Sequence, residues 1–230
     1  MLMRKLVGAI SPIAVLACFG IGSAMKMYAD EPGEAVVREQ SVNNLKEIGL
    51  AIYNFHDQSG SLPAHAIYSK DGKTPLLSWR VVILPYLGQA KLYEEFKRDE
   101  PWDSAHNKKL IAKMPKTYAM AGATKAKDGE TYYQVVIGPD TLFRGSKKMK
   151  LQDVTDGTSN TLLVAEAKAP VVWTRPSDLS LPKDKDARLP VGGLFTNGFN
   201  VLLCDGSVRF LPHNIPVAKF RALITPAARD

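Results

Sequence analysis

Cysteine is nearly absent from this chain. Only 2 of the 230 residues are cysteine, Cys18 and Cys204. Two cysteines cannot build the disulfide framework that stabilises many small secreted domains, so the chain must bury a hydrophobic core instead. Its length and its 45% hydrophobic content are enough for one such core. A lone cysteine without a paired histidine is usually a buried apolar residue, so we expect no thiol chemistry.

Long apolar runs are scarce too, which excludes a polytopic membrane protein. One run stands out, the nineteen uncharged residues Leu6–Ala24 behind the basic stretch Met1–Lys5. This order is typical of an export leader. Three fates stay open: cleavage after Ala24, an uncleaved membrane anchor that just reaches bilayer length, or lipidation at Cys18. In each case we expect an extracytoplasmic body, secreted or periplasmic, that meets the membrane only through this segment.

The rest of the chain reads as one domain. We assign residues 1–24 to the signal peptide or anchor, 25–33 to a linker and 34–230 to a single domain without internal repeats. The sequence Asp30-Glu31-Pro32 has the chemistry of a helix start. A long helix should follow and stop at Gly60, with one apolar face formed by Ser41, Leu45, Ile48, Ile52 and Phe55, and Asn43, Asn44, Lys46, Glu47 and Asn54 mostly toward solvent.

Short helices and then strands follow along the chain. Ser78 should cap one helix, Gln89 should begin another, and Asp103-Ser104 should cap a third. The stretch Arg80–Leu84 can also be read as a strand. The remaining predictions are strands at Thr131–Ile137 and Thr161–Ala167, a surface excursion at Pro170–Pro190, a hairpin of Asn200–Cys204 with Ser207–Leu211 around Asp205-Gly206, and a last helix from Pro216. The fold class is α+β, with the long helix packed on an antiparallel sheet.

Reactive motifs are missing. The chain has no G-x-S-x-G, no H-E-x-x-H, no phosphate-binding glycine loop and no C-x-x-C pair. Two segments resemble the D-x-D-G-T motif of phosphatases, but Val154 and Leu203 stand where the nucleophilic aspartate would be. The four histidines lack ligand spacing. We expect no enzymatic activity.

Charge gives a weaker indication. The net charge is +7, and a basic cluster, Arg144, Lys147, Lys148 and Lys150, lacks the interleaved aromatic residues of a nucleic-acid site. We interpret this cluster as a solvated loop and expect no nucleic-acid partner. The excess could favour anionic surfaces, although charge of this size often serves only solubility.

Two groups of residues are candidate binding sites. Trp102, Asp103, His106, Asn107 and Trp173 could form a polar site beside an aromatic platform for a sugar; a helix cap with a buried tryptophan is the other interpretation. Asp153, Asp156, Asn160 and Asp205 could gather oxygens around calcium, or simply cap turns. Apart from this calcium we expect no cofactor.

Several motifs occur in one order between Val36 and Leu211. They are Asn43–Lys46 with Ile48–Ala51, Asn54–Asp57, Ser78-Trp79-Arg80, Leu84–Leu87, Asp99–Lys109, Asp156–Thr161 with Glu166, Trp173-Thr174 with Pro176, Gly198–Val201 and Asp205–Phe210. Together they resemble a bacterial prepilin-like, or pseudopilin-like, domain family of unknown function, also labelled solute-binding-protein-like. The resemblance implies a pilin-like body outside the cytoplasm, no established activity and no catalytic residues to carry over.

The chain departs from that family at two points. Its apolar run and Pro32 replace the prepilin leader G-F-T-x-x-E and the unbroken helix that usually begin such proteins. Many relatives also carry cysteines where this chain has Ser41 and Met120. We expect a non-enzymatic, exported or envelope-anchored protein that contacts envelope proteins or surface polymers. The alternative is an extracytoplasmic module that binds a small solute or carbohydrate, assisted by calcium.

Overall fold

The computed structural model describes residues 33–120, 122–123 and 125–227. The apolar run at 6–24 and most of the proposed linker lie outside these residues, as do the predictions of cleavage, anchoring or lipidation for that run. Within the described part, no helix has both the length and the apolar character needed to cross a bilayer.

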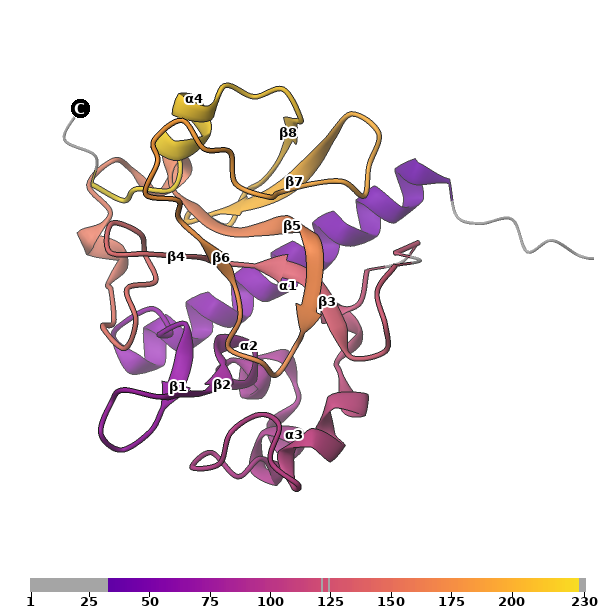
Figure 1. The fold of residues 1–230 in the computed structure, drawn as a ribbon, viewed down its shortest axis with the longest axis vertical. Coiled ribbons are helices and arrows are strands. Elements are labelled where there is room, and N and C mark those ends of the chain that lie inside the picture. Colours follow the sequence, from indigo (N-terminus) through magenta and orange to yellow (C-terminus); the bar gives the residue numbers. More distant parts are fainter. Residues whose placement is uncertain (1–32, 121, 124, 228–230) are drawn as a thin grey trace, which may run out of the picture. The chain divides into compact units, whose positions relative to one another are not determined.

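A long helix, α1 (Glu34–Ser59), begins the described chain (Figure 1). Leu45, Ile48 and Ile52 are buried along its inner face, as their spacing predicts. The helix ends at Gly60, which takes the left-handed conformation (φ 71°) that glycine adopts without steric cost. The expectation that Asn44 faces solvent is wrong. Asn44 is 8% exposed, because its amide donates hydrogen bonds to the Ala119 carbonyl and the Tyr133 hydroxyl.

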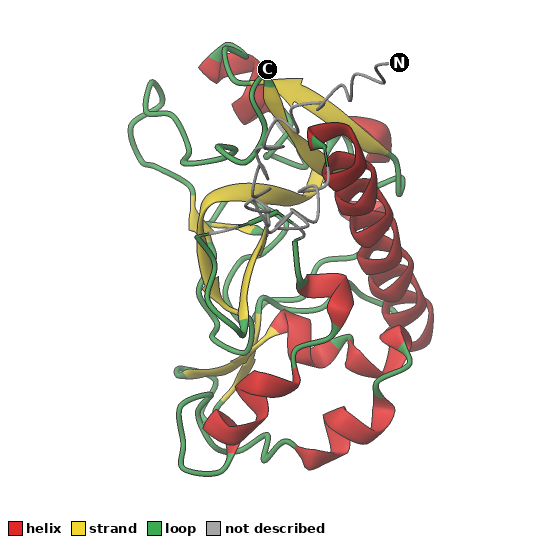
Figure 2. Ribbon diagram, turned by 90° about the vertical axis from the view of Figure 1, so that its right-hand side faces the viewer, coloured by secondary structure: helices red, strands yellow, loops and turns green. Residues whose placement is uncertain are grey.

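The predicted antiparallel sheet has four strands in the order β3-β5-β7-β8. They are β3 (Glu130–Gln134), β5 (Leu162–Val172), β7 (Gly198–Leu203) and β8 (Val208–Pro212). Strands β7 and β8 form the predicted hairpin, with Leu202 opposite Val208 and Gly206 at φ 81° in the turn. Figure 2 shows α1 running along one side of the strands. Gly49 allows the close approach, since a Cβ there would lie 3.2 Å from Leu202 Cδ1.

Strand β7 is buried along its whole length because both faces of the sheet are covered. Leu202 and Cys204 belong to the core shared with α1, whereas Val201 and Leu203 belong to a second core on the other face. That second core includes Phe220 of α4 (Val217–Ala222), the helix predicted to follow Pro216. The observed class is therefore α+β, as the sequence predicts.

The segment between α1 and the sheet holds the short elements. These are β1 (Ala66–Tyr68), β2 (Pro75–Ser78), α2 (Trp79–Val82), α3 (Ala90–Glu95), and 3₁₀ helices at Leu84–Leu87, Asn107–Lys113 and Lys116–Tyr118. Ser78 caps α2 as predicted, accepting the amide of Arg80. The third predicted helix is 3₁₀ rather than α and its N-cap position is His106, not Asp103 or Ser104, although Ser104 accepts the amide of Asn107 just before it.

The stretch Pro170–Pro190 is only partly the surface excursion that its prolines suggest. Strand β5 continues into it as far as Val172, and Trp173, Leu179 and Leu189 are each at most 6% exposed. The two-residue strands β4 (Val136–Ile137) and β6 (Leu179–Ser180) pair in parallel here. Burial of these apolar side chains packs the segment against the core. Two further 3₁₀ helices occur before β5, at Leu151–Asp153 and Thr158–Asn160.

Candidate functional site

The two tryptophans of the candidate sugar platform differ in burial: Trp173 is buried and Trp102 is half-buried. Trp173 is 0% exposed; its ring stacks on Tyr118 at 5.8 Å and meets the edge of Phe96 at 5.7 Å. Its indole N–H donates to the Ile111 carbonyl at 2.9 Å. Trp173 therefore has no face to offer a ligand. Trp102 is half-buried, with the Arg175 guanidinium 5.4 Å from its ring centroid.

The polar residues around Trp102 mostly hold the local backbone together. Asn107 is fully buried, and its amide nitrogen donates to the carbonyls of Lys97, Glu100 and Pro101 while its oxygen accepts the Lys97 amide. His106 Nε2 lies 2.8 Å from the Glu95 carbonyl oxygen. These contacts join the loop at residues 97–101 to the start of the 3₁₀ helix, which is a structural role. A ligand role stays a prediction for Trp102, for His106 and for the exposed Asp103.

The candidate calcium ligands are each engaged in their own loops. Asp153 accepts the Lys150 amide at 2.9 Å, and Asp205 accepts the amide and hydroxyl of Ser207 at 2.9 and 2.6 Å. Asn160 donates to the Asp156 carbonyl. No group of three or more histidine, cysteine, aspartate or glutamate side chains that could hold a metal occurs in the described chain. The turn-capping interpretation accounts for every contact shown here.

A buried polar network lies instead between α1 and the sheet, around Glu166 of β5. Its carboxylate accepts the Ser41 hydroxyl at 2.5 Å, the Asn200 backbone amide at 2.7 Å and the Asn200 side-chain amide at 2.9 Å. The Tyr133 hydroxyl donates to Ser41 at 3.0 Å and accepts from Asn44. Burial raises the pKa of Glu166, and the bonds from Ser41 and Asn200 partly oppose that rise.

A second buried network adjoins the first through Tyr133. Arg80 Nη2 and Asp178 Oδ1 form an ion pair of 2.7 Å with both side chains 0% exposed. The same guanidinium donates twice to the Tyr133 carbonyl, at 3.0 and 2.7 Å. Trp79 Nε1 and the Val135 amide also donate to Asp178 Oδ1. Burial raises the pKa of Asp178, while the Arg80 charge opposes the rise.

The side chains of these two networks are inaccessible to a substrate. Ser41 beside a carboxylate superficially resembles a nucleophile with its base, but Ser41, Glu166 and Asn200 are each at most 1% exposed. A substrate would have to enter the packed interface of α1 and the sheet. General acid–base or nucleophilic catalysis needs a position for the reacting atom near both groups, and the packed interface offers none. The networks instead bind α1, α2 and the sheet to one another.

The structure is thus that of an α+β domain with two buried polar networks between its helices and its sheet. The chain belongs to the family described as protein of unknown function (DUF1559), whose model matches residues 34–124 and 111–188. No curated protein and no solved structure matches the chain. The family resemblance found in the motifs is thereby confirmed at the level of a domain of unknown function.

The sequence motifs pointed to several members of the two networks without revealing their role. Asn44, Arg80 and Glu166 each belong to a quoted motif, and the structure brings all three to Tyr133. Asp178 was missed, because a lone aspartate in a proline-rich stretch looks like a loop residue. The neighbouring Trp173-Thr174 motif was the available signal, since a buried tryptophan places the next few residues close to the core.

Proposed function

We propose that this protein is an exported or envelope-anchored, pseudopilin-like protein that works by contact with envelope proteins or surface polymers, without catalysis. One observation carries the proposal. Three polar side chains of its motifs, Asn44, Glu166 and Asn200, are engaged in packing α1 against the sheet, as the three bonds to Glu166 illustrate. Polar groups that serve the fold in this way are unavailable for turnover at a surface.

The sequence before α1 supports the exported setting. The uncharged run Leu6–Ala24 follows basic residues, and α1 begins at Glu34, ten residues after the end of that run. Long N-terminal helices packed on antiparallel sheets are also the arrangement that the pseudopilin-like resemblance implies. The outer face of α1 leaves Val36 59% and Leu50 63% exposed, which offers apolar contact points for a neighbouring protein.

The test is the location and N-terminus of the native protein. We expect protease added to intact cells or spheroplasts to digest the body, and mass spectrometry to find a terminus after Ala24, a lipid on Cys18 or the intact leader. A body protected inside the cytoplasm would overturn the export proposal. Turnover of any substrate that is abolished by Glu166→Gln, with folding intact by circular dichroism, would overturn the non-catalytic one.

A second candidate function is an extracytoplasmic module that binds a small solute or carbohydrate. The observation in its favour is that Trp102 is only half-buried and is followed in the chain by exposed Asp103. Thermal unfolding with a panel of neutral glycans, with and without calcium, tests it. A raised midpoint that is lost in Trp102→Ala supports the module, whereas unchanged midpoints in every condition contradict it.

A further inference from the structure

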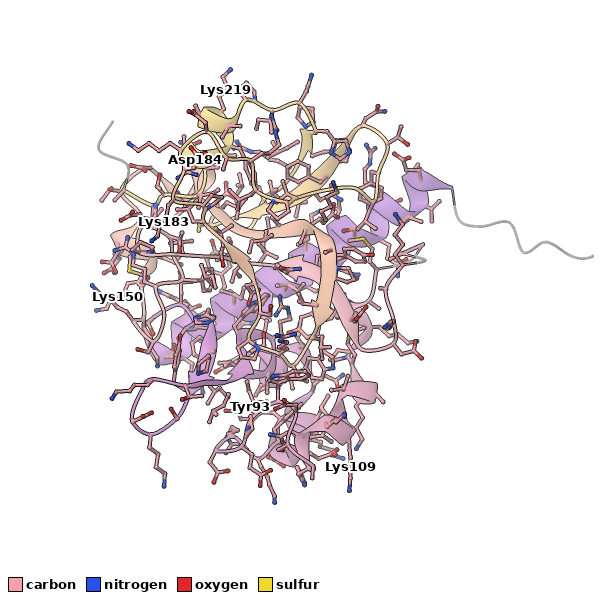
Figure 3. All side chains as sticks on the ribbon, viewed as in Figure 1. Tyr93, Lys109, Lys150, Lys183, Asp184 and Lys219 are labelled. Carbon is pink, nitrogen blue, oxygen red and sulfur yellow. The ribbon has the colours of Figure 1, made fainter. Side chains whose placement is uncertain are left out.

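The basic excess of the protein is concentrated in three segments, 138–153, 181–188 and 216–227. Together they carry nine lysines and arginines against four aspartates, in a chain whose net charge is +7. Figure 3 shows Lys150, Lys183 and Lys219 along one edge of the molecule, with Lys109 at the opposite end. The sequence interpretation of one basic loop as merely solvated did not take this convergence into account.

A pocket of about 490 Å³ lies where the three segments meet. Arg144 comes from the first segment, Lys185 from the second and Arg221 from α4 in the third. A volume of this size is in the range of pockets that hold small ligands or one unit of a polymer. The three basic segments therefore border one half-open pocket.

The two arginines are held in place without being neutralised. Arg221 donates to the carbonyls of Asp184 and Pro182 at 3.2 and 3.1 Å, and Arg144 Nε donates to the Thr141 carbonyl at 2.7 Å. Among the described residues, none of the nine basic side chains forms an ion pair with a carboxylate. Backbone carbonyls orient a guanidinium but leave its full charge for an anion.

The rest of the lining narrows the ligand class. Asp140 and Asp186 also face the pocket, and they can accept hydrogen bonds from hydroxyl groups. Leu181, Ala218 and Ala222 add a small apolar surface. Cations for an acidic group, carboxylates for hydroxyls and an apolar patch for a C–H face together match one charged sugar unit. Two aspartates would oppose a densely charged ligand that has no hydroxyls to offer.

We propose that this pocket, which we call the α4 pocket, binds an acidic sugar unit of an anionic polysaccharide. This inference rests on the proposed function in one respect, because only an exported protein meets such polymers. It specifies the proposed surface polymer as an acidic polysaccharide. Lys183 and Lys219, which are near pocket-lining Lys185 and Ala218 in the chain, would then attract neighbouring charged units of the same polymer.

The test is binding of the full-length chain, purified in mild detergent, to polygalacturonate, with neutral dextran for comparison. We expect polygalacturonate to bind, dextran not to bind, and binding to weaken as salt rises. The triple variant K183Q/K185Q/K219Q should bind at least about tenfold more weakly. The matched control K108Q/K109Q/K116Q removes the same charge from exposed lysines of the 3₁₀ helices at Asn107–Lys113 and Lys116–Tyr118, none of which lines the pocket, and should bind nearly as wild type does.

A charge-neutral variant separates the pocket from the general field. Ala218→Trp fills the α4 pocket from an exposed position of α4 and leaves every charge in place, so it should also reduce binding by about tenfold. Equal loss in both lysine triples, or no loss in Ala218→Trp, would overturn the pocket. Binding to phosphatidylglycerol vesicles but not to polygalacturonate would overturn the polysaccharide. Each of these results leaves export and non-catalytic contact standing, because those are judged by location and turnover.

Discussion

At the scale of single residues, burial of the Glu166 carboxyl group is unfavourable for stability unless hydrogen bonds compensate it. A buried carboxylate is stable only when donors surround it, and here three donors from α1 and β7 do so. Asn200 supplies two of them, yet its own Oδ1 is buried without a partner in the described part of the chain. The network is therefore not optimised for stability alone, and its ionisation state should affect folding.

Glu166→Gln should change how stability depends on pH. Burial raises the folded pKa of Glu166 above its ordinary value of 4.5, so the folded protein holds this proton more tightly than the unfolded chain. Unfolding then releases a proton as pH rises above about 4.5, and this residue's contribution to stability falls with rising pH up to the folded pKa. Glutamine does not titrate. We expect the wild-type free energy of unfolding, minus that of the variant, to fall as pH rises.

Urea unfolding from pH 4 to 8, followed by circular dichroism, measures this difference. Glu39→Gln, at an exposed position of α1, controls for the loss of one negative charge. A difference that is flat with pH would mean that Glu166 does not titrate differently in the folded state. Loss of one hydrogen bond in the variant at every pH shifts the curve of stability against pH without changing its slope.

The sequence predicts the burial of some of these residues and not of others, depending on what each sequence pattern indicates. Helical spacing placed Ser41 on the inner face of α1 correctly, since a periodicity reports which face is buried. Asn44 was assigned with its polar neighbours to the outer face, although it lies three residues after Ser41 and four before Ile48, beside the inner face. Its burial depends on the Ala119 carbonyl and the Tyr133 hydroxyl, 75 and 89 residues away in the chain. Helical spacing carries no information about such distant partners.

At the scale of elements, local chemistry predicted starts and stops well. Gly60 ends α1, Ser78 caps α2, and Asp205-Gly206 makes the β7–β8 turn, because each depends on a few neighbouring residues. The stretch after Pro170 was harder, since its course is set by where Trp173 and Leu179 find apolar partners. Burial of those residues depends on the tertiary fold, which proline content does not report.

Gly198→Ala should destabilise the β7–β8 hairpin. A Cβ at this position would lie 2.2 Å from the Leu211 carbonyl oxygen and 2.7 Å from the Phe210 ring, so backbone or ring must move. Overpacking of this kind costs about 1–3 kcal/mol, and a clash with rigid backbone belongs at the upper end. Gly33→Ala is the matched control, because no heavy atom lies within 4 Å of its added Cβ. Chemical denaturation of both variants tests the prediction, and equal midpoints would contradict it.

At the scale of the whole molecule, the sheet is a middle layer. Its β7 strand faces α1 through Leu202 and faces the α4 side through Val201 and Leu203, so both faces of the strand carry buried apolar side chains. The continuous apolar run Val201–Cys204 could have indicated burial on both faces. We read it only as one arm of a hairpin, because a hairpin pattern does not say how many layers cover it.

The Arg80–Asp178 pair ties this layer to the helical part of the molecule. Arg80 belongs to α2, Asp178 follows β5, and Arg80 also donates to the Tyr133 carbonyl of β3. Neither side chain has any exposed surface. A buried pair of this kind adds little over an apolar substitute, but the loss of one partner leaves the other charge without compensation.

Asp178→Asn should therefore be the most damaging conservative change in the protein. Asparagine keeps the shape and an oxygen for the Val135 amide, but leaves the Arg80 charge buried and unpaired, at a cost of about 3–5 kcal/mol. Glu100→Gln is the control, because it removes a carboxylate from the exposed Lys97–Glu100 pair of 3.0 Å and should hardly change unfolding. The urea midpoints of both variants decide the matter. Similar losses would show that solvent reaches Arg80 in solution and that the pair does not hold the two parts together.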